Sequence, residues 1–165
     1  RSAQRILDVG TGTGVLAITA ARAGANSVVA TDVNPSAVAC ARANVRQHGL
    51  DSRIVVEQAD FAPRSPGAHF DLVICNPPYF KGVPRNHAQL AYMGGANLEW
   101  FDRFTYSVRP HLTLHGRALL VLSDAADLPA IMERLSAGGW AYRVVARRDI
   151  TIEVMYIVEL VPRNL

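Results

Sequence analysis

The chain has 165 residues; half are hydrophobic, 19% are charged, and the formal net charge is +3. This composition predicts one globular domain with a sizeable core and excludes a disordered chain. No apolar stretch is long enough to span a membrane, and no secretory leader pattern is visible, so we expect no membrane partner and a cytoplasmic location. The only cysteines, Cys40 and Cys75, lie in apolar contexts and are expected to be buried free thiols.

The first predicted strand, residues 5–9, runs into the glycine turn Gly10-Thr11-Gly12-Thr13-Gly14, and a helix is predicted over residues 15–22. The dinucleotide fingerprint G-x-G-x-x-G would need a glycine where this chain has Val15. An acid, Asp8, stands just before the turn. This pattern favours an adenosyl ligand that carries an amino acid over a pyrophosphate. The alternative is a tight strand–helix turn that binds nothing.

Acidic residues also end the next two predicted strands. Asp32 follows the strand at residues 27–31, at the position where such folds place a carboxylate that binds ribose hydroxyls. After a helix over residues 34–48, the third strand, residues 53–58, leads to Asp60-Phe61. Asp60 could accept a hydrogen bond from an adenine amino group while Phe61 packs on the ring. The alternative is a turn aspartate before Pro63.

The fourth predicted strand begins at Phe70 and ends abruptly in Asn76-Pro77-Pro78-Tyr79. Neither proline can donate a hydrogen bond to a sheet, and each restricts the residue before it to extended conformations. We therefore expect a stiff loop at the carboxyl end of a strand. The Asn76 side-chain oxygen and a backbone carbonyl can together accept hydrogen bonds from a planar –NH2 group, while Tyr79 stacks on it. Such acceptors would stabilise the positive charge that develops as the nitrogen attacks an electrophile.

The rest of the chain is predicted in less detail. Residues 80–97 are expected to form a mobile loop whose basic residues could meet a phosphate or an acidic peptide, or could simply be solvated. Asn97 is expected to cap a helix that ends at Val108. A strand over residues 118–123 and a helix over residues 125–137 follow. Two further strands, residues 141–146 and 150–161, are expected to form an antiparallel hairpin with its turn at Arg147-Arg148-Asp149.

With these motifs in order and at ordinary spacing, the chain resembles the class I S-adenosylmethionine-dependent methyltransferases over essentially its whole length. The Asn-Pro-Pro-Tyr motif is similar to that of enzymes that methylate adenine N6, guanine N2 or a glutamine amide. Residues 94–99 resemble the Gly-Gly segment of the HemK-like release-factor glutamine methyltransferases, while residues 79–82 resemble the "small" RNA methyltransferases. The chain starts almost at its first strand, so we expect the N-terminal helices that these families use for substrate recognition to be absent.

The resemblance implies an α/β, Rossmann-like class I methyltransferase fold, with a mostly parallel, doubly wound sheet and a C-terminal antiparallel hairpin. It implies S-adenosyl-L-methionine as cofactor and no metal. Asn76 and Pro77 would accept from the target –NH2, and Tyr79 would stack on it. The implied cofactor-binding residues are Asp8, Gly10, Thr11, Gly12, Gly14, Asp32, Val33, Asp60, Phe61 and Asn76.

Three functions remain open at this point. The first is methylation of a glutamine amide in a protein substrate of the release-factor type. The second is methylation of an exocyclic amine in RNA or DNA, where a base in a duplex would have to be flipped out. The third is a non-catalytic nucleotide-binding domain or a dehydrogenase, against which the glycine spacing argues.

Overall fold

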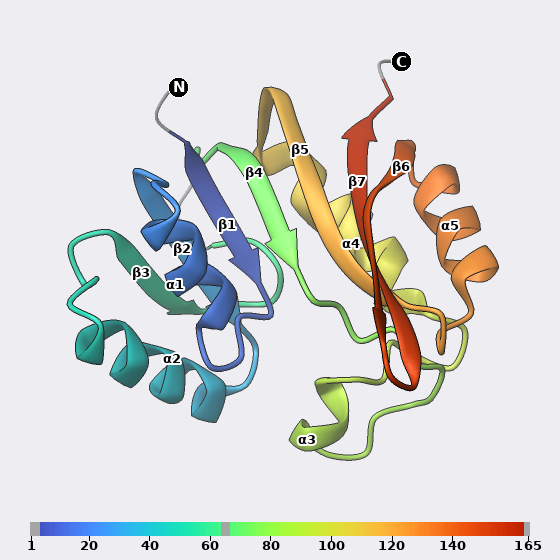
Figure 1. The fold of residues 1–165 in the computed structure, drawn as a ribbon, viewed down its shortest axis with the longest axis horizontal. Helices are drawn as coiled ribbons and strands as arrows, with labels where there is room; N and C mark the ends of the chain where they lie inside the picture. The colour runs from blue at the N-terminus through green and yellow to red at the C-terminus, as the bar shows by residue number, and fades with distance from the viewer. Residues whose placement is uncertain (1–3, 64–66, 164–165) are drawn as a thin grey trace. The chain divides into compact units, whose positions relative to one another are not determined.

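The structure, a computed structural model, describes residues 4–63 and 67–163. The chain divides into two units, whose helices and strands carry the labels used in Figure 1. The first unit runs to Cys75 and includes Pro110–Gly116, and the second unit consists of Asn76–Arg109 and the residues from Arg117 onward. Apart from Asn76, the predicted cofactor-binding residues therefore belong to the first unit, and the Asn-Pro-Pro-Tyr motif begins the second.

Four parallel strands form the first unit in the order β3-β2-β1-β4. Their bounds are β1 (Arg5–Val9), β2 (Ser27–Asp32), β3 (Ile54–Gln58) and β4 (Phe70–Cys75). Apolar side chains such as Leu7, Val28 and Val73 are buried, because helices α1 (Val15–Arg22) and α2 (Pro35–Gln47) pack against the strands. The predicted elements of this unit are confirmed. One expectation was wrong: Cys75 is buried, but Cys40 is exposed on α2.

The second unit ends in antiparallel strands in the order β5-β7-β6. Its elements are α3 (His87–Leu90), α4 (Glu99–Val108), the later part of β5 (Leu112–Ser123), α5 (Leu128–Ala137), β6 (Trp140–Ile150) and β7 (Glu153–Pro162), and a 3-10 turn (Arg109–His111) leads into β5. The apolar face of α4 buries Phe101, Phe104 and Val108. Strand β5 contributes to both units, and the described residues form one sheet ordered β3-β2-β1-β4-β5-β7-β6. The predicted fold class, a mostly parallel α/β sheet with an antiparallel C-terminal part, is confirmed.

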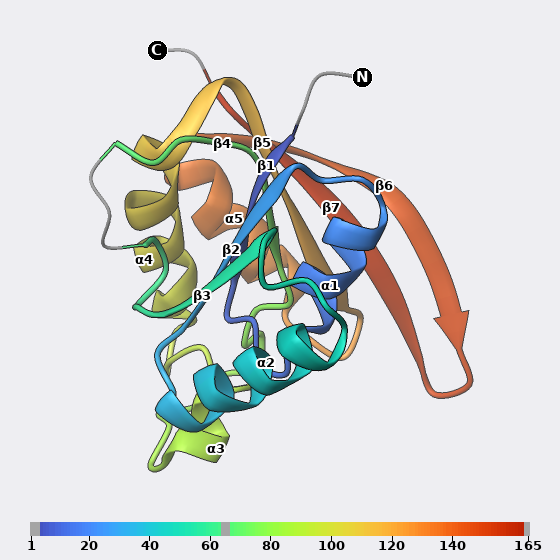
Figure 2. The same ribbon diagram turned by 90° about the vertical axis from the view of Figure 1, so that its left-hand side faces the viewer.

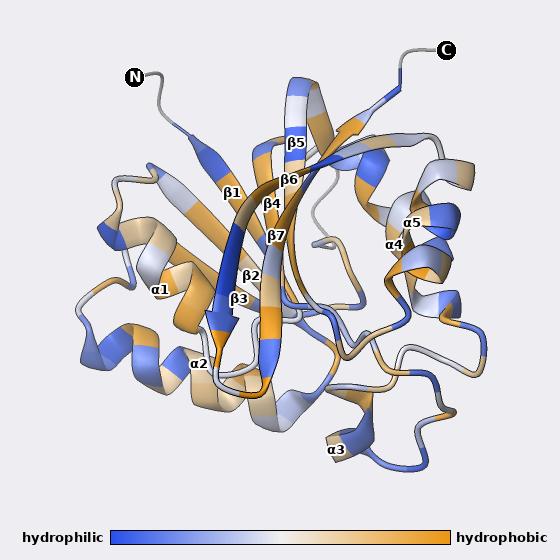
Figure 3. Cartoon of the chain, turned by 45° about the vertical axis from the view of Figure 1, so that its right-hand side comes forward, coloured by the Kyte–Doolittle hydropathy of each residue, from blue (hydrophilic) through white to orange (hydrophobic). Residues whose placement is uncertain are grey.

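The C-terminal hairpin is longer than predicted, and its predicted turn was wrong. Arg147, Arg148 and Asp149 lie within β6, paired with residues of β7, and the turn is at Thr151-Ile152. An irregularity in register at Val145 adds a residue to β6. Past Trp140 every residue of this edge strand is exposed, and charged side chains are common on edge strands because they discourage further pairing. Figure 2 shows the hairpin extending well past α5, and Figure 3 shows a strongly hydrophilic stretch near the end of β6.

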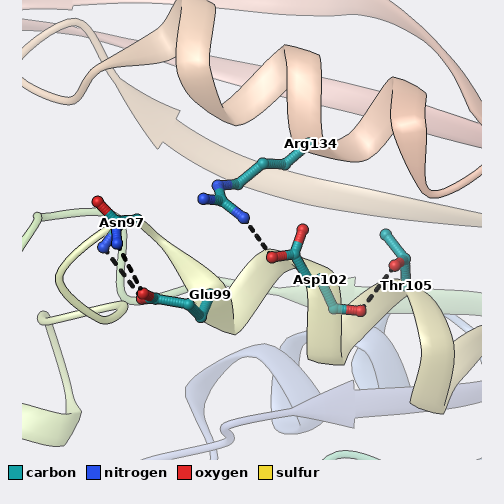
Figure 4. A network of polar contacts seen from close by, with 5 residues as sticks. All are labelled: Asn97, Glu99, Asp102, Thr105 and Arg134. Carbon is teal, nitrogen blue, oxygen red and sulfur yellow. Dashed lines mark hydrogen bonds and ion pairs between the residues drawn. The ribbon is translucent and has the colours of Figure 1, made fainter.

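The start of α4 also differs from the prediction. The residue at the cap is Leu98, in the left-handed region with φ 64°, and it is fully buried. Asn97 binds Glu99 instead: its backbone N–H donates to Oε2 at 3.0 Å and its Nδ2 donates to Oε1 at 3.1 Å (Figure 4). Later in α4, Asp102 forms an ion pair with Arg134 of α5. None of the described helices is both long enough and apolar enough to cross a membrane.

Candidate active site

The glycine turn at residues 10–14 depends on backbone conformations that favour glycine. Gly10, Gly12 and Gly14 all have positive φ, at 67°, 56° and 86°. A Cβ added at Gly10 or Gly12 would meet nothing within 4 Å, so open space adjoins the backbone there. A Cβ at Gly14 would lie 3.4 Å from the side chain of Ala41. The first two glycines thus leave room beside the turn, and the third allows α1 to start close to α2.

Asp8 is fully buried and accepts two hydrogen bonds, one from the glycine turn and one from α1. Its Oδ2 accepts hydrogen bonds from Thr11 Oγ1 at 2.6 Å and from the Ala17 N–H at 3.0 Å. Burial raises the pKa of Asp8 from 3.8 to about 6, although the two hydrogen bonds oppose the rise. Its Oδ1 is buried and has no hydrogen-bond partner among the described residues. A buried acceptor without a donor is costly, so this oxygen is suited to a cationic or N–H donor from a ligand.

The carboxylate of Asp32, at the end of β2, is fixed by two backbone amides. Its Oδ2 accepts from the Gly12 N–H and its Oδ1 accepts from the Asn34 N–H, both at 2.9 Å. A carboxylate oxygen can accept a second hydrogen bond, so both oxygens retain capacity for a pair of hydroxyl groups. Val33, the next residue, has a 45% exposed side chain, which leaves it accessible to a ligand.

The Asp60-Phe61 turn after β3 is held in a strained conformation. Phe61 has φ 67°, which is unusual for a bulky residue, and its side chain is buried. The buried hydroxyl of Thr31 donates to the Phe61 carbonyl at 2.6 Å. Asp60 is exposed. Strain of this kind often marks a ligand site. Thr31 matches no sequence motif, because its contact joins β2 to the turn after β3, 30 residues further along the chain.

These residues fit S-adenosyl-L-methionine. Open space beside Gly10 and Gly12 suits its methionine part, the unpartnered Asp8 oxygen suits its ammonium group, and Asp32 suits its ribose hydroxyls. The Thr11 side chain is buried and donates to the Asp8 carboxylate, so any role of Thr11 at this site would be exerted through Asp8. No group of three or more potential ligating residues of a metal ion occurs within residues 4–63 and 67–163.

Asn76-Pro77-Pro78-Tyr79, here called the acceptor loop, continues directly from β4. Cys75, the last residue of β4, pairs with Val9, the last residue of β1. The Asn76 side chain is exposed, both prolines are buried and Tyr79 is half-buried. The Tyr79 ring packs edge-on against Phe80, with centroids 5.0 Å apart. The loop thus presents an exposed Asn76 beside two buried prolines, directly after β4.

A later segment, Tyr92–Gly95, here called the bracing segment, hydrogen-bonds to the residues that follow the acceptor loop and lies against Pro78 within it. The Gly94 N–H donates to the Phe80 carbonyl at 2.8 Å, and the Phe80 N–H donates to the Tyr92 carbonyl at 3.0 Å. A Cβ on Gly94 would overlap the carbonyl oxygen of Pro78. Two more backbone hydrogen bonds join Gly82 and Gly95, at 2.9 and 3.1 Å. The bracing segment is therefore an ordered part of a region that had been expected to be a mobile loop.

Two further polar residues, Glu153 and Ser123, were not found from the sequence. Burial and then the negative charge of Glu153 raise the pKa of Tyr79. The buried hydroxyl of Ser123, at the end of β5, donates to the Glu153 carboxylate. These residues lie far apart in the sequence and match no motif, so only the pairing of β5 with β7 reveals the cluster.

Comparison with known proteins identifies the family. Residues 1–148 match the methyltransferase small domain family. The chain therefore belongs to this family, within the class I S-adenosylmethionine-dependent methyltransferases.

Three relatives show the range of this family. A ribosomal protein L11 methyltransferase of Thermotoga neapolitana is 34% identical over 85% of this chain and 45% of its own length. A putative protein N5-glutamine methyltransferase of Methanocaldococcus jannaschii is 27% identical over 93% of this chain and 79% of its own length. A tRNA1(Val) (adenine(37)-N6)-methyltransferase of Shewanella loihica is 30% identical over 90% of this chain and 63% of its own length. The chain thus spans from about half to about four fifths of these relatives.

Solved structures share the fold. In the E. cuniculi Mtq2–Trm112 complex, described as responsible for methylation of the termination factor eRF1, one chain matches with a TM-score of 0.69 and 25% identity. The match covers 99% of this chain and 87% of that one. A ribosomal protein L11 methylase from Lactobacillus delbrueckii matches with a TM-score of 0.70 at 20% identity, over 99% of this chain and 72% of that one.

Proposed function

We propose that this protein transfers a methyl group from S-adenosyl-L-methionine to a planar –NH2 group, and that the acceptor is a glutamine amide of a protein. The observation that carries the proposal is the acceptor loop, which presents an exposed Asn76 beside two buried prolines directly after a buried strand. The family supports the cofactor, and the residues around the glycine turn suit it.

The roles of the residues follow from the chemistry of an amide nitrogen. Its lone pair is delocalised, so it is a poor nucleophile. The Asn76 Oδ1 and the Pro77 carbonyl would each accept a hydrogen bond from the –NH2 group. These hydrogen bonds would favour a pyramidal nitrogen and stabilise the positive charge that develops on it. Tyr79 would stack on the plane of the amide. The cofactor supplies an electrophilic methyl group on a sulfonium.

The proposed reaction needs no side chain of the protein as a general base. The cofactor would supply its methyl group to the nitrogen and leave as a neutral thioether that keeps the electron pair of the broken carbon–sulfur bond. The methylated nitrogen would then lose a proton to water. Catalysis would come from positioning and from electrostatic stabilisation by Asn76 and Pro77.

Two comparisons support a protein acceptor. The M. jannaschii relative, whose name specifies N5-glutamine, aligns over most of both chains, and so does the structure associated with methylation of eRF1. Residues 94–99, which begin within the bracing segment, are the part of this chain that resembles the release-factor group. An exocyclic base amine is the second candidate, supported by the S. loihica relative and by residues 79–82.

The test is methyl transfer from cofactor labelled in the methyl group to separate protein and RNA fractions, followed by hydrolysis and identification of the labelled product. We expect N5-methylglutamine from the protein fraction, and no labelling by the Asn76→Ala variant. Labelled N6-methyladenine or N2-methylguanine alone would show that the second candidate is correct. Absence of transfer to either fraction would contradict the proposed activity.

A further inference from the structure

Glu153, the first residue of β7, is held in one orientation by a buried serine. Ser123 Oγ accepts a hydrogen bond from the Ala125 N–H at 3.1 Å and donates its single hydrogen to Glu153 Oε2. Ser123 is fully buried at the end of β5. One carboxylate oxygen of Glu153 is thus fixed by the fold, and the other retains its capacity to accept.

Within the part of the chain that the structure describes, no cation balances the charge of Glu153. Among the described residues Glu153 forms no ion pair, although it is half-buried. The other glutamate of β7, Glu159, differs in this respect, because its charge is balanced by ion pairs with Arg117 at 3.2 Å and with Arg143. A half-buried carboxylate without a cation is unfavourable for stability, and such groups are concentrated at functional sites.

Glu153 also lies in the same part of the second unit as the acceptor loop. Its charge acts on the phenol of Tyr79. Lys81, which follows the acceptor loop, forms a 2.6 Å ion pair with Asp127. Asp127 caps α5, because its Oδ1 accepts from the Ala130 N–H. It comes four residues after Ser123 in the chain. One ion pair thus joins the residue two positions after the acceptor loop to the start of α5, and one hydrogen bond joins the end of β5 to the start of β7.

We propose that Glu153 is a substrate-binding residue whose carboxylate accepts a hydrogen bond from a peptide main-chain N–H next to the target glutamine. This inference rests on the proposed function and adds the group that recognises the peptide. An ionised carboxylate only accepts hydrogen bonds, and a peptide offers an N–H donor at nearly every residue. A nucleic acid would instead bring phosphates toward the carboxylate, and like charges repel each other.

The experiment uses a peptide library in which each member carries one glutamine, flanked by either lysine or aspartate. Wild type, Glu153→Ala, Glu153→Gln and a control, Glu133→Ala on the exposed face of α5, are compared for KM, kcat and cofactor affinity. A hydrogen bond to a charged acceptor predicts that Glu153→Ala raises the peptide KM by about 10- to 100-fold, with cofactor affinity unchanged. Glu133→Ala should match wild type.

Glu153→Gln keeps the shape of the side chain and an acceptor for Ser123 but removes the charge. Because the negative charge of Glu153 would also attract a lysine beside the bound main chain, we expect wild type to prefer the lysine-flanked peptides and Glu153→Gln to lose that preference, a change that a purely structural role would not produce. A wild-type peptide KM and an unchanged preference in both Glu153 variants would overturn the inference, even if Tm falls. If wild type methylates no peptide but does methylate RNA, the proposed substrate is wrong and this inference fails with it.

Discussion

The glycine turn and the acceptor loop are both short irregular segments that follow a buried strand, but they are held in different ways. The glycine turn is fixed by the carboxylates of Asp8 and Asp32, which accept from backbone or side-chain donors of the turn and of the residues close to it. The acceptor loop is stiffened by its own prolines and braced by Gly94, through backbone contacts. The first arrangement leaves carboxylate oxygens available to a cofactor, and the second leaves Asn76 accessible to a substrate.

This difference suggests that the two regions can be changed independently. Substitutions around the glycine turn should alter cofactor affinity, whereas substitutions in or beneath the acceptor loop should alter the rate of methyl transfer. The following predictions test that separation.

The largest effect is expected from Asn76→Ala. The variant loses an acceptor that matters most as charge develops on the nitrogen, so the rate should fall by about 100- to 1000-fold, by analogy with loss of one oxyanion-hole donor. Asn76→Asp keeps an acceptor and should retain more activity than Asn76→Ala. Single-turnover rates on folded protein would measure both. Wild-type turnover in Asn76→Ala would show that Asn76 only starts a turn.

A second large effect is expected from Gly94→Ala. The added methyl group would overlap the Pro78 carbonyl and displace the acceptor loop, and small displacements of reacting groups can cost about 100-fold in rate. Gly138→Ala is a matched control, because its Cβ would come within 2.7 Å of the Thr105 side chain in the same unit. We expect both variants to lower Tm, but only Gly94→Ala to lower kcat per folded molecule while cofactor affinity is retained. Equal kcat in the two variants would refute the bracing role.

The pH dependence of stability gives a smaller effect in the first unit. The pKa of Asp8 is raised from 3.8 to about 6, chiefly by burial, so the folded chain binds this proton more tightly than the unfolded chain. The resulting stabilisation is fully present below pH 4 and is lost as the pH rises through about 6, by roughly 3 kcal/mol in all. The free energy of unfolding, measured with urea, should therefore fall between pH 4 and 7.5 by an amount that Asp8→Asn does not show. Identical pH profiles would argue against a raised pKa.

The difference between the regions also explains what the sequence could predict. Alternating glycines, strand-ending aspartates and the two prolines are local signals, and the elements around them were predicted correctly. The contact of Gly94 with Pro78 and the Ser123–Glu153 pair are long-range contacts, which local patterns do not encode. The hairpin turn was misplaced because the polar run Arg147–Asp149 resembles a turn, whereas it continues an exposed edge strand past the register shift at Val145.

Comparison of Asp32→Ala with Asn76→Ala at saturating cofactor tests the separation of the two regions most directly. Calorimetry should show cofactor affinity reduced by at least about tenfold in Asp32→Ala, since each lost hydrogen bond to a charged acceptor is worth roughly 1.5–3 kcal/mol, and nearly unchanged in Asn76→Ala. Once cofactor is saturating, the single-turnover rate of Asp32→Ala should approach that of wild type, while that of Asn76→Ala stays low. A rate that stays equally low in both variants would contradict the assignment of cofactor binding to the glycine turn and methyl transfer to the acceptor loop.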